Sequence, residues 1–88
     1  MLKISITSDS DEAIQFQLEG NLAGPWVEEL QRLSDEALSH QKALSLDLER
    51  LWYVDLRGVT LLRDLARRQV SQVNCSQFVS QQLKERTL

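Results

Sequence analysis

The 88-residue chain has few of the residues on which common catalytic and structural sites depend. Its single cysteine, Cys75, excludes an internal disulfide, and with the single histidine, His40, it cannot make up a zinc site. Its three glycines are widely separated and form no phosphate-binding loop. No apolar run reaches the about 18 residues of a membrane-spanning helix, and the first residues lack the long apolar stretch that is typical of a signal peptide. We therefore expect a cytoplasmic protein that is not an enzyme, inserts into no membrane and needs no metal or cofactor.

The length and composition indicate one globular domain over residues 1–88. The hydrophobic fraction of 42% is ordinary for a folded protein and too high for a disordered one. A chain of 88 residues has no room for a second core. The single core should be modest, so we expect the fold to be sensitive to truncation of core side chains.

The charges are distributed unevenly along the sequence. Residues 1–49 contain ten acidic and three basic residues, whereas residues 50–88 contain seven basic and three acidic ones. The first part therefore carries a net charge of −7 and the second +4. This polarity predicts steering toward a charged protein partner, with ordinary solvated surfaces as the alternative. It does not predict nucleic-acid binding, because no dense basic patch is combined with aromatic residues.

Apolar and polar residues alternate in three segments, 2–6, 14–18 and 44–48, which predicts three half-buried strands. The first two form a β-hairpin around a loop at 7–12, and the second strand ends at Gly20 and Asn21. Residues 51–54 continue the third segment as an apolar run, in which alternation should send Trp52 and Tyr53 to opposite faces. Residues 70–74 are the candidate for a short fourth strand.

Three further segments have apolar residues at spacings of three and four, which predicts helices. The first opens at Gly24 and Pro25, because proline suits the first helical position. The second begins near Gly58, and Ser76 is a candidate N-cap for the third. The predicted inward residues are Val27, Leu30, Leu33, Ala37 and Leu38 in the first helix, Val59, Leu61, Leu62, Leu65 and Ala66 in the second, and Phe78, Val79 and Leu83 in the third.

The resulting order β-β-α-β-α-β-α predicts an α/β fold. Strand–helix–strand units favour parallel pairing, and the opening hairpin adds an antiparallel strand. We expect a small mixed four-stranded sheet packed with about three helices.

Residues 47–62, DLERLWYVDLRGVTLL, resemble the signature of STAS domains. In that family a strand ends in Asp-Leu, and an apolar run then leads to Asp-(Ser/Thr)-(Ser/Thr)-Gly at the start of a helix that contains Leu-Leu. Upstream, residues 18–22 resemble the exit of the family's second strand. The element order agrees with that of the family over nearly the whole chain, so the resemblance implies a STAS-like fold.

The resemblance implies a regulatory module that works by protein–protein contact. The best-known STAS domains are anti-sigma-factor antagonists, which bind kinase-like anti-sigma factors and so regulate transcription in bacterial signalling. Other members are cytoplasmic parts of membrane transport complexes for lipids or anions, which implies a transporter ATPase as the alternative partner. A third interpretation is a stand-alone structural subunit or a homodimer whose signature loop has degenerated.

The signature loop supplies the candidate partner-binding residues, and it departs from the family at one point. In STAS domains switched by phosphorylation, the acceptor hydroxyl lies between the aspartate and the glycine. The chain has Leu56 and Arg57 there, and neither can accept a phosphoryl group. We therefore hypothesise that the usual kinase switch is missing, and we expect Thr60, the nearest hydroxyl, to be an ordinary helix-surface residue. The candidate site is Asp55, Leu56, Arg57, Gly58, Thr60 and Arg63.

These residues also have plainer interpretations. Asp55 could act only as a helix N-cap, and Gly58 could only relieve a tight strand-to-helix turn. Arg57 could be a solvated surface side chain. Arg63 and Arg67, four residues apart, are expected to share one outward helix face, which is either a basic strip for an acidic partner or simply a solvated surface.

Overall fold

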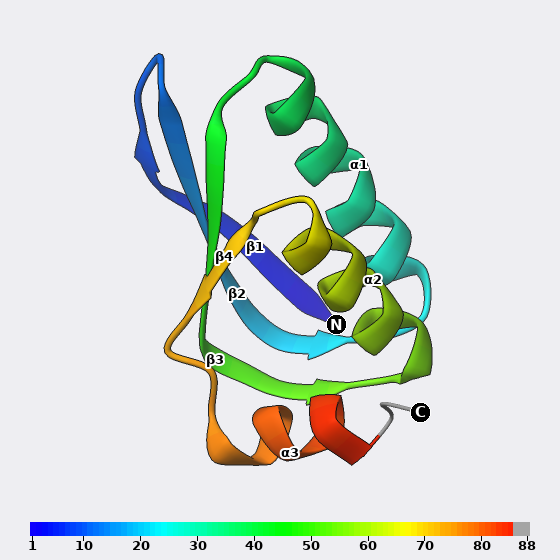
Figure 1. The fold of residues 1–88 in the computed structure, drawn as a ribbon. Helices are drawn as coiled ribbons and strands as arrows, with labels where there is room; N and C mark the ends of the chain where they lie inside the picture. Colours follow the sequence, from blue (N-terminus) through cyan, green and yellow to red (C-terminus); the bar gives the residue numbers. More distant parts are fainter. Residues whose placement is uncertain (86–88) are drawn as a thin grey trace.

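The computed structural model describes residues 1–85 and confirms the predicted α/β fold, with a mixed four-stranded sheet and three helices (Figure 1). Arg86, which was counted in the basic part of the sequence, lies outside the described residues. The elements are β1 (Leu2–Asp9), β2 (Ala13–Leu22), α1 (Pro25–Ser39), β3 (Ala43–Val54), α2 (Leu56–Arg67), β4 (Ser71–Val73) and α3 (Gln77–Glu85).

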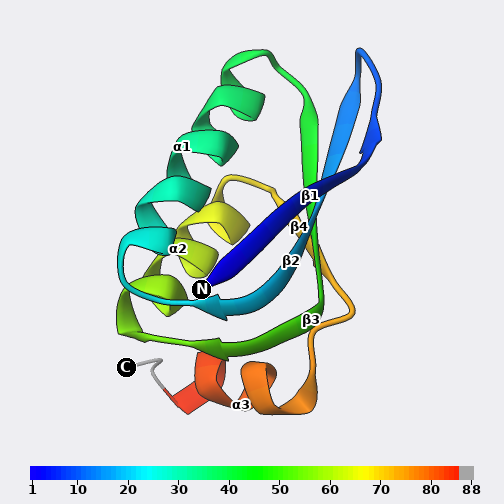
Figure 2. The ribbon, with the colours of Figure 1, turned by 180° about the vertical axis from the view of Figure 1, so that it is seen from behind.

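The strands lie in the order β1-β2-β3-β4. β1 and β2 pair antiparallel, as the predicted hairpin requires, and β2–β3 and β3–β4 pair parallel. Both α1 and α2 cover one face of the curved sheet, and α3 lies on the other side of the C-terminal half of β3 (Figures 1 and 2). The parallel pairing of β2 and β3 brings the ends of these two strands, and hence the starts of α1 and α2, to the same edge of the sheet.

The hairpin strands are longer than alternation predicted. Residues 7–9 continue β1 after a register shift between Ile6 and Ser8, so only residues 10–12 form the turn. The Ser10 hydroxyl stabilises this turn by accepting a hydrogen bond from the Ala13 N–H. The second strand, predicted to end at Gly20 and Asn21, continues one residue further to Leu22. Gly20 has a φ of 110°, and a Cβ there would collide with the main chain of Met1 beside it.

β3 is one continuous twelve-residue strand that contains two irregularities. Between Gln17 and Glu19 of β2, and again between Gly20 and Asn21, the paired segment of β3 has one residue more than that of β2. An extra residue of this kind is a β-bulge, which interrupts the alternation of faces and bends the strand. The apolar run at 51–54 is therefore the bent second half of β3.

The bulges change which side chains of β3 are buried. Leu48, Leu51 and Val54 are all buried, so burial recurs every third residue in this part of the strand. Trp52 and Tyr53 are both exposed, by 60% and 42%. Neither aromatic side chain lies in the core, so the unbroken two-residue alternation from which Trp52 and Tyr53 were predicted to point to opposite faces does not hold here.

The predicted inward helix residues are mostly confirmed as core or as half-buried neighbours of the core. The exceptions are Ala66 and Phe78, which are exposed. Phe78 directly precedes the fully buried Val79, and adjacent helical residues point about 100° apart. Ser76 accepts the Val79 N–H at 3.1 Å, which confirms it as the N-cap of α3. The core comprises Leu2, Ile14, Phe16, Leu18, Leu22, Val27, Leu30, Ala37, Leu44, Leu46, Leu48, Leu51, Val54, Val59, Leu61, Leu62, Leu65, Val70 and Val79.

Candidate partner-binding site

The Asp55 carboxylate lies at the start of the candidate site and makes two hydrogen bonds. Its Oδ1 accepts the Gly58 N–H at 2.7 Å, which confirms Asp55 as the N-cap of α2. Its Oδ2 accepts the Gly24 N–H at 3.0 Å, and Gly24 directly precedes α1. This second bond was not predicted from the sequence. One half-buried carboxylate therefore joins the starts of two helices.

The two strand-to-helix turns also pack directly against each other. The Asp55 N–H donates to the Leu22 carbonyl at 3.1 Å. A Cβ at Gly58 would lie 2.7 Å from both that carbonyl oxygen and Val54 Cγ1, so glycine is needed here for close packing. Gly24 adopts φ 59° and ψ −137°, a conformation that favours glycine. The hydrogen bond between the two turns and the close packing at Gly58 therefore fix the turn that carries the candidate residues.

Leu56, Arg57 and Thr60 form the exposed part of the site. Leu56 is 57% exposed although it is apolar. Arg57 Nη2 lies 2.9 Å from Glu28 Oε1 in the first turn of α1, so Arg57 is more than a solvated side chain. Both members of this ion pair are exposed, and such pairs contribute at most about 1 kcal/mol. The Thr60 hydroxyl donates to the Leu56 carbonyl at 3.0 Å, within the same helix.

A groove of about 590 Å³ runs between α1 and α2 beside these residues. Leu56, Arg57 and Thr60 line it, whereas Asp55 and Gly58 support the turn from which it starts. Residues of both α1 and α2 line the groove, so it extends the exposed part of the site along the two helices. Its full lining is Val27, Gln31, Leu56, Arg57, Thr60, Leu61, Asp64 and Arg67.

Arg63 does not line the groove beside α1. Its Nη2 donates a hydrogen bond to the Leu83 carbonyl of α3, and its side chain is half-buried. The prediction that Arg63 and Arg67 share one outward face was wrong, because Arg63 faces α3 and Arg67 lines the groove beside α1. Both arginines do lie on one helix, four residues apart, but the sequence spacing does not show that α3 packs over Arg63.

Charges from the two parts of the sequence meet within the molecule. Arg57 pairs with Glu28, and Arg68 pairs with Asp35 at 2.9 Å, so two ion pairs connect α2 to α1. Arg68 also lies 3.7 Å from Asp64. These ion pairs neutralise some of the charged side chains that were expected to steer the protein toward a charged partner.

Residues 1–85 contain no group of three or more His, Cys, Asp or Glu side chains placed to hold a metal ion. Cys75 is half-buried, and this burial raises the pKa of its thiol, which lowers the thiolate fraction at neutral pH. No helix among the described residues is long and apolar enough to cross a membrane.

Comparison with known proteins shows similarity of fold. No family model matches the sequence, and no curated protein matches it either. The structure is similar to that of the anti-sigma factor antagonist SpoIIAA in its unphosphorylated form, with a TM-score of 0.67, 20% identity, and coverage of 93% of this chain and 82% of that chain. It is also similar to an uncharacterized DUF3478-family protein with a SpoIIAA-like fold from Shewanella loihica, with a TM-score of 0.59, 18% identity, and coverage of 88% and 69%. The chain therefore has a fold similar to that of SpoIIAA.

Proposed function

We propose that this chain is a non-catalytic regulatory module that binds a protein partner, as an anti-sigma-factor antagonist does. The observation that carries the proposal is the exposure of Leu56 and Arg57 on a turn whose base Asp55 fixes with two hydrogen bonds. An arginine beside an exposed apolar side chain suits a protein interface, where arginine is enriched among residues that dominate affinity. A preformed turn also lowers the ordering cost of binding.

The proposed module works without a phosphoacceptor in the signature loop. Phosphorylation would add a charge of about −1.5 to −2 at the start of α2. Arg57 instead carries a positive charge there, and the Thr60 hydroxyl is bonded to a carbonyl of its own helix. Intact mass after incubation with the partner kinase and ATP should show no added phosphate. A stoichiometric phosphate on residues 55–60 would contradict the hypothesis.

The proposed partner is a kinase-like anti-sigma factor. A small subunit of a lipid or anion transport complex would use the same surface to bind a transporter ATPase, so the identity of the partner separates these two functions. We further propose that residues 1–88 form one domain and that the protein is cytoplasmic, as the sequence predicts. The proposal includes neither nucleic-acid binding nor membrane insertion.

Affinity purification from the native lysate with wild type and Arg57→Glu tests the site. Arg50→Glu is the matched control, because Arg50 is exposed in β3 and the charge change is identical. We expect wild type and Arg50→Glu to retain the same partner and Arg57→Glu to lose it. Retention of that partner by Arg57→Glu would place the interface elsewhere.

A charge swap separates direct contact from a supporting role. The double variant Glu28→Arg/Arg57→Glu keeps an ion pair between α1 and α2 but reverses the charge on the turn. If Arg57 touches the partner, the swap should bind as poorly as Arg57→Glu; recovery of binding would instead assign Arg57 to holding the helices together. If no partner is retained and light scattering shows concentration-dependent dimers, self-association replaces the proposed function.

A further inference from the structure

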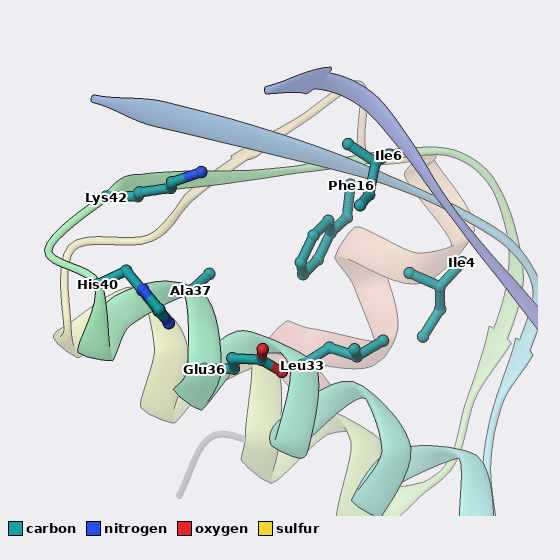
Figure 3. A pocket seen from close by; sticks show the side chains of 8 residues that line it. All are labelled: Ile4, Ile6, Phe16, Leu33, Glu36, Ala37, His40 and Lys42. Atoms are coloured by element: carbon teal, nitrogen blue, oxygen red, sulfur yellow. The ribbon is translucent and has the colours of Figure 1, made fainter. Parts of the chain in front are cut away.

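A second cavity lies far from the signature loop, between the β1–β2 hairpin and the C-terminal part of α1 (Figure 3). Its volume is about 460 Å³, within the range of about 300–1,000 Å³ of small-molecule sites. The 15 residues of α1 span about 22 Å at about 1.5 Å per residue, and the two cavities lie toward opposite ends of this helix. The lining residues are Ile4, Ile6, Phe16, Leu33, Glu36, Ala37, His40 and Lys42.

The cavity exists because the helix layer does not fully cover β1. Ile4 and Ile6 pair with Leu18 and Phe16 of β2, so they lie on the helix-facing side of the sheet. Their partners are fully or nearly fully buried, yet Ile4 is only half-buried and Ile6 is 60% exposed. α1 packs against β2 and β3, while β1 lies at the edge of the sheet. Apolar side chains on the core-facing side are thus left open to solvent.

The charged groups around the rim of this cavity carry one net negative charge, because three carboxylates, of Asp9, Glu29 and Glu36, lie beside two cations, Arg32 and Lys42, with His40 counted as neutral. Lys42 Nζ lies 2.6 Å from Asp9 Oδ1, so these two charges neutralise each other. Glu36 is exposed and forms no ion pair within residues 1–85. Arg32, one turn earlier on α1, is hydrogen-bonded to Glu29 at 2.6 Å and is also attracted more weakly by Glu36. A positively charged group at the rim would therefore be attracted by the exposed Glu36 carboxylate, whereas an anion would be repelled by it.

We propose that this cavity binds small amphipathic molecules that combine a linear apolar part with a protonated amine. The apolar part would contact Ile4, Ile6, Phe16 and Leu33, which extend from the sheet and from α1 into the same space (Figure 3). Covering Ile6 supplies the hydrophobic driving force. The ammonium group pairs with the Glu36 carboxylate at the open rim. The site is independent of the proposed partner-binding function.

Three probes with the same eight-carbon chain test the proposal: n-octylammonium, octan-1-ol and octanoate. Each is titrated into the ¹⁵N-labelled full chain at neutral pH, and amide shifts are followed by NMR. We expect saturable shifts around Ile4, Ile6, Leu33 and Ala37, with octylammonium binding about fivefold more tightly than octanoate. The preference should be of this modest size because an exposed charge pair is partly screened by solvent.

Two variants test which cavity residue contacts the ammonium group and which contacts the apolar chain of the ligand. Glu36→Gln should abolish the preference for octylammonium and leave octanol binding unchanged. Glu49→Gln is its matched control, because Glu49 is exposed in β3 and does not line the cavity. Ile6→Thr, at a largely exposed position where folding should be retained, should weaken all three probes by a similar factor.

Any of four results would overturn the proposal. These are the absence of saturable binding, equal affinity for the three probes, shifts confined to residues outside the cavity, and a cation preference that persists in Glu36→Gln. Analytical ultracentrifugation provides a further test of Ile6. A dimer that Ile6→Thr abolishes would show that a second copy of the chain, and no amphipathic molecule, covers this side chain.

Discussion

Asp55 Oδ2 lies 3.0 Å from the backbone nitrogen of Gly24, a residue 31 positions earlier in the chain. Because Oδ1 of the same carboxylate caps α2, one side chain satisfies amide groups at the starts of two helices. Such groups have no partner inside their own helix and need one from elsewhere. The signature aspartate thus has a structural role at two places, and it fixes the turn that carries Leu56 and Arg57.

Replacing Asp55 by alanine should destabilise the fold by about 2–4 kcal/mol, because both amide groups lose their acceptor and each such loss costs about 1–2 kcal/mol. Urea denaturation of Asp55→Ala beside wild type measures this change. Asp55→Asn should cost less, since one amide oxygen can still accept a bond. Asp11→Asn in the exposed hairpin turn is the control and should be neutral. A stable Asp55→Ala would show that the shared carboxylate does not hold the turns.

Gly58→Ala should destabilise the protein by about 1–3 kcal/mol through overpacking. The added Cβ would lie 2.7 Å from the Leu22 carbonyl oxygen and from Val54 Cγ1, and the backbone oxygen cannot easily move away. Thermal unfolding followed by circular dichroism measures the loss. Thr60→Ala, two residues later on the exposed side of α2, is the control and should change stability by less than about 0.5 kcal/mol. Equal stability of Gly58→Ala and wild type would mean that the turns are less tightly packed than the structure shows.

The bulges of β3 predict opposite responses at two neighbouring residues. Leu51→Ala should cost about 2–5 kcal/mol, because Leu51 is buried in the core. Trp52→Ser should change stability by less than about 0.5 kcal/mol, because Trp52 is largely exposed. Guanidinium denaturation of both variants distinguishes this register from regular alternation. A large loss for Trp52→Ser would contradict the exposed placement of the aromatic pair.

Burial of Cys75 predicts a pH-dependent reactivity. Its thiol pKa is raised in the folded protein, so at mildly alkaline pH less thiolate is present than in the unfolded chain. Alkylation by iodoacetamide should be slower in the native protein, and its midpoint should lie at higher pH. The related stability contribution is present below the unfolded pKa and is lost as pH rises through the folded pKa. Equal pH profiles for native and urea-unfolded protein would refute the shift.

Features that depend on a few neighbouring residues could be predicted from the sequence. Pro25 at the start of α1 and the caps formed by Asp55 and Ser76 involve partners within three residues, so composition and spacing were sufficient. The same reasoning gave the element order and the fold class. The prediction failed at Ala66 and Phe78, where only the tertiary packing determines which side of a helix is covered.

The candidate site was predicted in part for the same reason. The signature located Leu56 and Arg57 on an exposed turn, but the bond from Gly24 to Asp55 and the contact of Arg63 with α3 join residues far apart in sequence. The register of β2 against β3 also determines where β3 gains its extra residues, and no local pattern contains that register. Charge counting likewise could not show that Arg68 pairs with Asp35 on the neighbouring helix.

The two bulges of β3 also account for a difference in path length. The C-terminal halves of β2 and β3 curve around α2, and β3 follows the outer and therefore longer arc (Figures 1 and 2). β3 has twelve residues and β2 has ten, and each additional strand residue supplies about 3.3 Å. Deleting one residue of β3 near Glu49 would remove this length and turn the following leucine and valine away from the core. The curvature that lets one small sheet wrap its helices is thus encoded as unequal strand lengths.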